Sequence, residues 1–253
     1  MTALGDTAPP RPRPERLITQ NSGLRRHGIF NFSLPAWAGR LPDGRTYNTC
    51  PTAGVCAAVC YARHGTYRFP QVRAKHQRNL ARILDDLPQW EADILAELAH
   101  TKFRDGVALR VHDSGDYFSD AYALAWLRIA RAVPDVLFYS YTKEVDRFRR
   151  LVEPDPPDNF RWVYSYGGKQ DHLIDPMTDR VADVFPDEAA IAEAGWNSNA
   201  ATDLAAVLGP SPVGMSQNNI PHLRRKIGGR TFREWQAAHQ ARGRDITRDR
   251  FHP

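Results

Sequence analysis

This chain of 253 residues has few cysteines and no long apolar run. Its three cysteines cannot all pair with one another, and all of them lie between positions 50 and 60. Clustered thiols in a protein that is not secreted are typical of metal binding or catalysis, not of a disulfide framework. No apolar segment approaches the roughly 18 residues needed to cross a bilayer, and the first thirty residues lack the apolar core of a signal peptide. We therefore expect a cytoplasmic protein with no membrane partner.

Two other features are absent. The chain has no internal repeat, and the run Gly167-Gly168-Lys169 lacks the remaining spacing of a phosphate-binding loop. The second absence argues against an ATPase. A hydrophobic content of 42% over this length can bury one sizeable core. We expect a monomer with one principal domain.

The cysteines form the pattern Cys50-x5-Cys56-x3-Cys60, in a segment where Pro51 and Gly54 favour a loop. Thiolates are the ligands of soft metals and iron-sulfur clusters. A structural zinc ion almost always takes four ligands, whereas a [4Fe-4S] cluster held by three cysteines keeps one iron open. Two alternatives stay open. His64 completes a CCCH pattern typical of zinc proteins that bind nucleic acid, and clustered cysteines can also be ordinary buried side chains.

The order of predicted elements divides the chain into three parts. The first 16 residues are rich in Pro and Arg, and we assign residues 1–27 to a disordered arm. Residues 28–220 alternate between strands and helices, which indicates a parallel sheet in an α/β fold. Residues 221–253 form a basic C-terminal extension with an amphipathic helix at 231–241.

Apolar alternation and helical periodicity locate the elements of the middle part. The predicted strands span 30–34, 107–111, 136–141, 160–166, 180–185 and 213–217. The predicted helices span 69–84, 88–102, 119–133, 144–152 and 187–194. A turn at 42–45 predicts a small hairpin before the cysteines. About six parallel strands would make a partial (β/α)6 barrel, in which active sites lie at the carboxyl ends of the strands.

Two resemblances give this order a meaning. The cysteine loop resembles that of radical S-adenosylmethionine enzymes, although the usual spacing there is three then two residues. The runs NFSLPA, CPTAGVCAAVCYARHGTY and HDSGDYFS resemble the actinobacteriophage gene-product-88 family over residues 28–220. The first resemblance implies a TIM-like partial barrel of the radical S-adenosylmethionine type.

The same resemblance implies roles for the polar residues that follow the strands. Ser114-Gly115-Asp116 is similar to the Gly-Gly-Glu motif that holds the amino group of S-adenosylmethionine, with Asp116 pairing with that ammonium. The predicted cofactor residues are Tyr61, Ser114, Gly115, Asp116, Ser140 and Ser165. The predicted metal ligands are Cys50, Cys56 and Cys60. His112 and Asp113 are the candidate catalytic residues for handling protons or substrate. The alternative for His112 is a core histidine whose hydrogen bonds are satisfied.

The expected function is radical chemistry with two cofactors, a [4Fe-4S] cluster and S-adenosylmethionine, and with an external electron donor. The competing hypotheses are a CCCH zinc protein that binds nucleic acid and an iron-sulfur redox sensor that does not cleave the cofactor.

Charge suggests a substrate class. Residues 221–253 contain nine Lys or Arg against three acidic residues, with the aromatics Phe232, Trp235 and Phe251 interleaved. This composition is typical of a surface that follows a phosphate backbone, and equally of a solvated helix. A second basic run, from Arg63 to Arg82, directly follows the cysteines. We expect a nucleic acid, nucleotide or other phosphorylated substrate.

Overall fold

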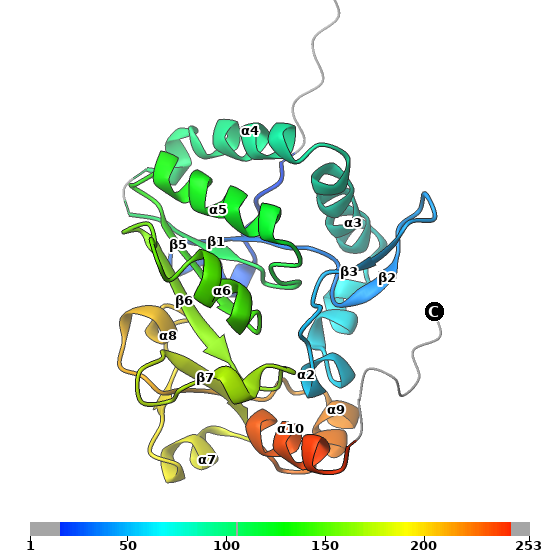
Figure 1. Cartoon of the computed structure of the whole chain (residues 1–253), viewed down its shortest axis with the longest axis vertical. Coiled ribbons are helices and arrows are strands. Elements are labelled where there is room, and N and C mark those ends of the chain that lie inside the picture. Colours follow the sequence, from blue (N-terminus) through cyan, green and yellow to red (C-terminus); the bar gives the residue numbers. More distant parts are fainter. Residues whose placement is uncertain (1–15, 105, 244–253) are drawn as a thin grey trace, which may run out of the picture.

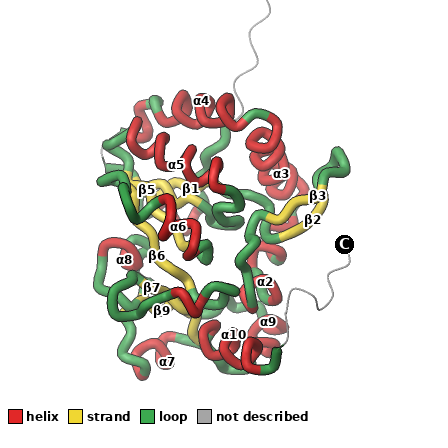
Figure 2. The backbone as a smooth tube through the Cα atoms, in the orientation of Figure 1, coloured by secondary structure: helices red, strands yellow, loops and turns green. Residues whose placement is uncertain are grey.

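The computed structural model describes residues 16–104 and 106–243 (Figure 1). Within these ranges, seven parallel strands form one sheet in the order β1-β4-β5-β6-β7-β9-β8. The sheet curls into a half-barrel, with its strands gathered at the centre of the molecule and helices around them (Figure 2). The strands are β1 (Ile29–Phe32), β4 (Ala108–Val111), β5 (Leu137–Thr142), β6 (Phe160–Ser165), β7 (Val181–Phe185), β8 (Asn197–Ser198) and β9 (Val213–Ser216). The predicted α/β class with a curled parallel sheet is confirmed, and so are all six predicted strands.

The main core lies between the outer face of the sheet and a layer of four helices. These are α3 (Pro70–Asp85), α4 (Leu87–Leu98), α5 (Asp120–Ala132) and α6 (Val145–Leu151). Because side chains alternate along a strand, Leu109 and Phe138 point outward, where they pack with Trp90 and Trp126 from the helices. Ser119 begins α5 by accepting a hydrogen bond from the Tyr122 amide.

The inner face of the sheet has a smaller core at its amino-terminal end. Ala108, Tyr139 and Val163 point inward there. They are covered by Leu24 from α1 (Ser22–Arg25) and by Val207 from α8 (Ala205–Leu208). These two short helices close only one end of the half-barrel, and the cavity described below lies at the other end, where the strands finish.

The boundary predicted for the N-terminal arm is too late. Residues 1–15 lie outside the described chain, but Leu17 and Ile18 are buried in the main core. The amide of Thr19 also pairs with the Asn31 carbonyl of β1 at 2.8 Å. Ordered structure therefore begins before residue 28, because these apolar side chains have a place in the core.

The C-terminal extension is part of the fold. Its helices are α9 (Pro221–Ile227) and α10 (Phe232–Ala241), and α10 begins at a capping box formed by Thr231 and Glu234. Phe232 and Trp235 are buried against α9 and the cysteine segment. They are therefore not exposed for stacking on bases, which corrects the predicted use of these aromatics. Phe251, the third one, lies outside the described residues.

A small hairpin and several short helices complete the described chain. β2 (Ala38–Arg40) and β3 (Thr46–Asn48) are antiparallel, which confirms the predicted hairpin. The short helices are α2 (Val55–Ala58), η1 (Tyr61–Arg63), η2 (Gly65–Arg68), η3 (Thr101–Phe103), η4 (Asp171–Leu173) and α7 (Glu188–Glu193). Among the described residues, no helix has the length and apolar character to span a membrane.

Candidate functional site

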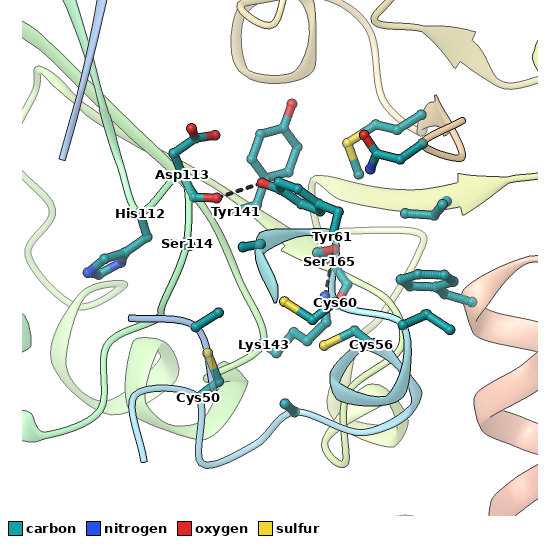
Figure 3. A pocket seen from close by; sticks show the side chains of 18 of the residues that line it. Cys50, Cys56, Cys60, Tyr61, His112, Asp113, Ser114, Tyr141, Lys143 and Ser165 are labelled. Atoms are coloured by element: carbon teal, nitrogen blue, oxygen red, sulfur yellow. Dashed lines mark hydrogen bonds between the residues drawn. The ribbon is translucent and has the colours of Figure 1, made fainter. Parts of the chain in front are cut away.

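The cysteine segment lies across the carboxyl ends of the strands, where the half-barrel is open (Figure 1). Cys56 is in α2, Cys50 precedes it, and Cys60 directly precedes η1. The three side chains line one cavity of about 460 Å³. In Figure 3 the sulfur atoms of Cys56 and Cys60 lie near each other, and Cys50 faces the same space from another side. The three thiols therefore share one cavity.

Backbone hydrogen bonds attach the cysteine segment to β4 and β6. The amides of Gly54 and Cys56 both donate to the carbonyl of Gly167, just after β6, at 3.1 and 3.2 Å. The amide of Asp116, after β4, donates to the Thr49 carbonyl at 2.8 Å. These bonds tie the segment, including the start of α2, to the residues that follow β4 and β6.

Two buried side chains hold the same segment. The carboxylate of Glu144, after β5, accepts hydrogen bonds from the amide and hydroxyl of Thr52 at 3.2 and 2.7 Å. On the opposite side, Oε1 of Gln236 in α10 accepts from the Val55 amide at 2.9 Å. Both side chains are less than 7% exposed. Because buried polar groups without partners are costly, these contacts fix the position of the loop.

The three thiols are partly buried. Burial raises the pKa of Cys60 to about 12, and it raises the pKa of Cys50 and of Cys56 as well. The ammonium of Lys143 acts in the opposite direction on Cys56 and Cys60, since a nearby positive charge favours the thiolate. Lys143 therefore lies close enough to these two thiols to affect their charge, and it lines the cavity with them.

The Ser114-Gly115-Asp116 turn lines the same cavity, although it lies more than fifty residues after the cysteines. The Ser114 hydroxyl donates to the Leu34 carbonyl at 2.5 Å, which ties the turn to the chain after β1. Gly115 has φ +89°, and a Cβ there would lie 2.8 Å from Cβ of Leu34. Glycine is therefore required by the packing of this turn.

Asp116 is buried and hydrogen-bonded within the chain. Its Oδ1 accepts from the Tyr117 amide at 2.8 Å and from the Thr142 hydroxyl at 2.7 Å, and its Oδ2 accepts from the Lys143 amide at 2.9 Å. Burial raises the pKa of Asp116, while these hydrogen bonds lower it. The carboxylate joins the turn after β4 to the end of β5, and its remaining acceptor position is available to a ligand.

The two serines predicted to contact the cofactor, Ser140 of β5 and Ser165 of β6, lie on different faces of the sheet. Ser165 lines the cavity and bonds the Lys143 ammonium, Nζ to Oγ, at 2.8 Å. Ser140 is fully buried on the other face, where its hydroxyl accepts from Tyr117 at 3.1 Å. The cofactor role predicted for Ser140 does not match this placement. Its neighbours Tyr141 and Lys143 face the cavity instead. Because successive side chains of a strand point to opposite faces, the sequence of β5 could have predicted that Tyr141 and Lys143 share a face from which Ser140 is excluded.

The two candidate catalytic residues point in different directions. In Figure 3 the His112 ring is turned away from the cysteines. Its Nε2 atom pairs with the Tyr122 hydroxyl at 2.8 Å, and burial lowers its pKa to about 3, so it is neutral at pH 7. The His112 ring is therefore packed like that of a core histidine, although the residue is also among those that line the cavity. Asp113 lines the cavity as well, and its backbone carbonyl accepts from the Tyr61 hydroxyl at 2.5 Å. Tyr61, predicted to contact the cofactor, lines it too.

A charged cluster that the sequence did not reveal forms another wall of the cavity. Arg110 of β4 points inward and pairs with Asp203 at 3.0 Å. The carboxylate of Asp203 also accepts from the hydroxyls of Tyr139 and Tyr141 at 2.6 and 2.8 Å. Asp203 comes from an irregular segment before α8, so no periodic pattern indicated that it would meet Arg110.

The predicted metal donors of the cavity are its three cysteines. Within the described chain, no three His, Cys, Asp or Glu side chains are grouped closely enough to hold one ion. His64, the fourth ligand of the CCCH pattern, does not line the cavity, and its ring lies 4.8 Å from that of His222. In a cluster each thiolate binds a different iron, so the thiols need only surround a common space. The three cysteines line one cavity.

Fold and site together define an α/β half-barrel protein with a three-thiol cavity at the carboxyl ends of its strands. The family model described as gene product 88 matches residues 14–246, and the chain belongs to this family. It is 34% identical over 140 residues to the Gene 88 protein of Mycobacterium phage L5 and 32% identical to that of Mycobacterium phage D29. Each match covers 51% of this chain and 56% of the relative, so the chain spans little more than half the length of these relatives. No solved structure matches the chain.

Proposed function

We propose that this protein is a radical S-adenosylmethionine enzyme, in which Cys50, Cys56 and Cys60 hold a [4Fe-4S] cluster. One observation carries the proposal: the three thiols and the Ser114-Gly115-Asp116 turn line one cavity at the open end of a parallel half-barrel. A barrel of parallel strands builds its active site at that end. When bound, a reduced cluster of this kind supplies one electron to S-adenosylmethionine and so generates a carbon radical.

The residues around the thiols suit the binding of the methionine end of the cofactor. Asp116 has an acceptor position left for an ammonium group, after its three hydrogen bonds within the chain. Lys143, held by Ser165, presents a positive charge to a carboxylate. The two charges follow neighbouring strands, β4 and β5, and the Lys143 amide donates to Oδ2 of Asp116 at 2.9 Å. We assign Asp116 to the ammonium and Lys143 to the carboxylate.

The remaining walls suit the other parts of the cofactor and exclude water. The ring of Tyr61 lines the cavity and is held by its bond to Asp113, so it can pack against a flat base. Apolar side chains close the side next to the C-terminal helices; they are Val59, Leu223, Ile227 and Phe232. Exclusion of water prevents side reactions of a reactive intermediate. An external electron donor and a nucleic acid, nucleotide or other phosphorylated substrate complete the proposal.

Anaerobic reconstitution with iron and sulfide tests the metal assignment. We expect a brown protein with about four irons per chain, and we expect Cys50→Ala, Cys56→Ala and Cys60→Ala each to lose them. His64→Ala is the matched control and should keep the full iron content. A colourless protein that binds zinc and loses it in the His64→Ala variant would show the CCCH alternative instead.

A titration with S-adenosylmethionine then separates an enzyme from a redox sensor. The electron paramagnetic resonance signal of the reduced cluster should change on addition of the cofactor, because coordination to the open iron needs no turnover. In Lys143→Met the same change should require roughly ten- to a hundredfold more cofactor, since a hydrogen bond to a charged group contributes about 1.5–3 kcal/mol. A signal that does not respond at any concentration would favour the sensor.

A further inference from the structure

A second depression lies on the other side of the cysteine segment. It has a volume of about 1070 Å³ and is formed by the β2–β3 hairpin, the segment 61–68 and the start of α3; we call it the basic groove. Ala36 and Ala62 line both the basic groove and the cysteine cavity, so the two share a wall. Its volume lies just above the roughly 300–1,000 Å³ typical of small-molecule pockets, so it has room for a segment of a polymer.

The charge of the basic groove is of one sign. Five exposed cationic side chains line it, namely Arg40, Arg63, Arg68, Arg73 and Lys169. Among the described residues that line it, none is Asp or Glu. Cations from the hairpin, from segment 61–68, from α3 and from the turn after β6 thus converge on one concave surface. Such convergence attracts a ligand with repeated negative charges.

Flat rings lie between these charges. Tyr47 and Tyr67 line the basic groove and are partly exposed. His76 packs beside Tyr67, with ring centroids 5.8 Å apart, and burial lowers its pKa to about 4, so it adds a neutral ring at pH 7. The exposed side chain of Asn48 adds an amide at the rim. Aromatic faces between cations are the arrangement by which proteins bind single-stranded nucleic acids, because every base has a face that can stack.

A strained residue fixes the hairpin side of the basic groove. Trp37 has φ +55°, a left-handed conformation that a bulky residue rarely adopts. Its carbonyl accepts from the amide and hydroxyl of Thr49 at 2.7 and 3.0 Å, and its ring carries the Arg63 guanidinium at 5.3 Å. These contacts place Arg63 over an aromatic plane at the boundary with the cysteine loop. Strain of this kind persists only where the surroundings hold it in place.

We propose that the basic groove binds single-stranded nucleic acid, with phosphates on the arginines and bases stacked on Tyr47 and Tyr67. This surface is separate from the C-terminal helices, whose aromatics Phe232 and Trp235 are buried. The shared wall brings a strand bound in the groove next to the three thiols. The idea that the bound strand is the substrate rests on the proposed function. The binding of the strand in the basic groove does not depend on that function.

Fluorescence anisotropy with a labelled oligothymidylate of about 15 nucleotides tests the binding, at several salt concentrations. The double variant Arg68→Glu/Arg73→Glu should bind at least about tenfold more weakly, and its dependence of log K on log salt should be shallower by about 1.4. The control Arg161→Glu/Arg225→Glu makes the same change in net charge outside the groove and should bind like wild type. Equal losses in both double variants would mean attraction by net charge alone and would overturn the proposal.

Three further comparisons test the nature of the ligand. An abasic oligonucleotide of the same length should bind several-fold more weakly, because it retains the phosphates but has no bases to stack. Duplex DNA should bind more weakly than the single strand, and binding of heparin as tightly as the oligonucleotide would overturn the assignment to nucleic acid. The Cys50→Ala/Cys56→Ala/Cys60→Ala variant should bind the oligonucleotide like wild type. This variant lacks the proposed iron ligands, so unchanged oligonucleotide binding would show that the groove binds the strand without the cluster.

Discussion

Gly115 is the position where the turn beside the cavity depends most on a single atom. An alanine Cβ there would lie 2.8 Å from Cβ of Leu34, and φ is +89°. We expect Gly115→Ala to lower the free energy of unfolding by about 2–4 kcal/mol, from backbone strain and overpacking together. Urea denaturation of the two proteins measures this difference.

Gly28→Ala is the matched control, because Gly28 also has positive φ, at +67°, but has open space around its missing Cβ. It should show the backbone strain alone, about 1–2 kcal/mol. Equal losses at the two positions would contradict the contact between Gly115 and Leu34.

Glu144 gives the fold a pH dependence. Its pKa is raised from 4.5 to about 7, mainly by burial and also by the charge of Asp116, while Thr52 and Arg147 act in the opposite direction. Between pH 4.5 and 7 the unfolded carboxyl is ionised while the folded one keeps its proton, so the free energy of unfolding falls as pH rises. We expect this group to account for a loss of up to about 3 kcal/mol by pH 8.

Glu144→Gln has no proton to lose, so its stability should change less between pH 5 and pH 8 than that of wild type. Urea denaturation at the two pH values gives the comparison. Parallel changes in both proteins would show that Glu144 does not titrate in this range.

At the level of residues, the sequence was most informative where the combination of residue types is unusual. Three cysteines in eleven positions and a Ser-Gly-Asp turn after a strand are unusual enough to stand out, and they share the cavity. Arg110 and Asp203 were missed, since their pairing depends on a contact between distant segments. The sequence left two roles open for His112, and only the fold decides its orientation: the residue has φ of +68°, and its ring packs in the aromatic core.

At the level of elements, strong periodicity was a reliable guide and short segments were not. α3 and α5 begin and end within a residue or two of their predicted bounds, because each buries a full apolar face. β8 has two residues, too few for an alternating pattern, and α9 is a single short basic helix that shows little periodicity. The missed elements lie at the sheet edge and around the site, where tertiary contacts determine the conformation.

α10 affects the cysteine segment through one buried side chain. Gln236 accepts the hydrogen bond of the Val55 amide, and Val55 is fully buried. We expect Gln236→Ala to lower the free energy of unfolding by about 1–3 kcal/mol, because that amide would lose its partner.

Gln240→Ala is the control on the same helix. The side chain of Gln240 is exposed and donates to the Lys169 carbonyl at 3.4 Å. It should change the free energy of unfolding by less than about 0.5 kcal/mol. Similar losses from both variants would argue for a general effect of helix propensity.

At the level of the whole molecule, the two ends of the half-barrel differ: helices fill one end, and the cysteine cavity lies at the other. The amino-terminal end of its inner face is filled by α1 and α8, which leaves the carboxyl end free for the cysteine cavity. The hairpin and α3 then extend the molecule beyond the sheet (Figure 1). Residues of both elements line the basic groove. The two recesses are neighbours in space because one short loop contributes to both.

The cysteine segment is synthesised before the residues that hold it in place. Its partners are Asp116, Glu144, Gly167 and Gln236, all of which are translated later than the loop itself. At about 5–20 residues per second, roughly ten to forty seconds pass between the emergence of Cys56 and that of Gln236. During this interval the thiols belong to an unfinished chain without the contacts that bury them. They are then open to solvent oxidants, and to any metal carrier that acts before the ribosome has released the protein.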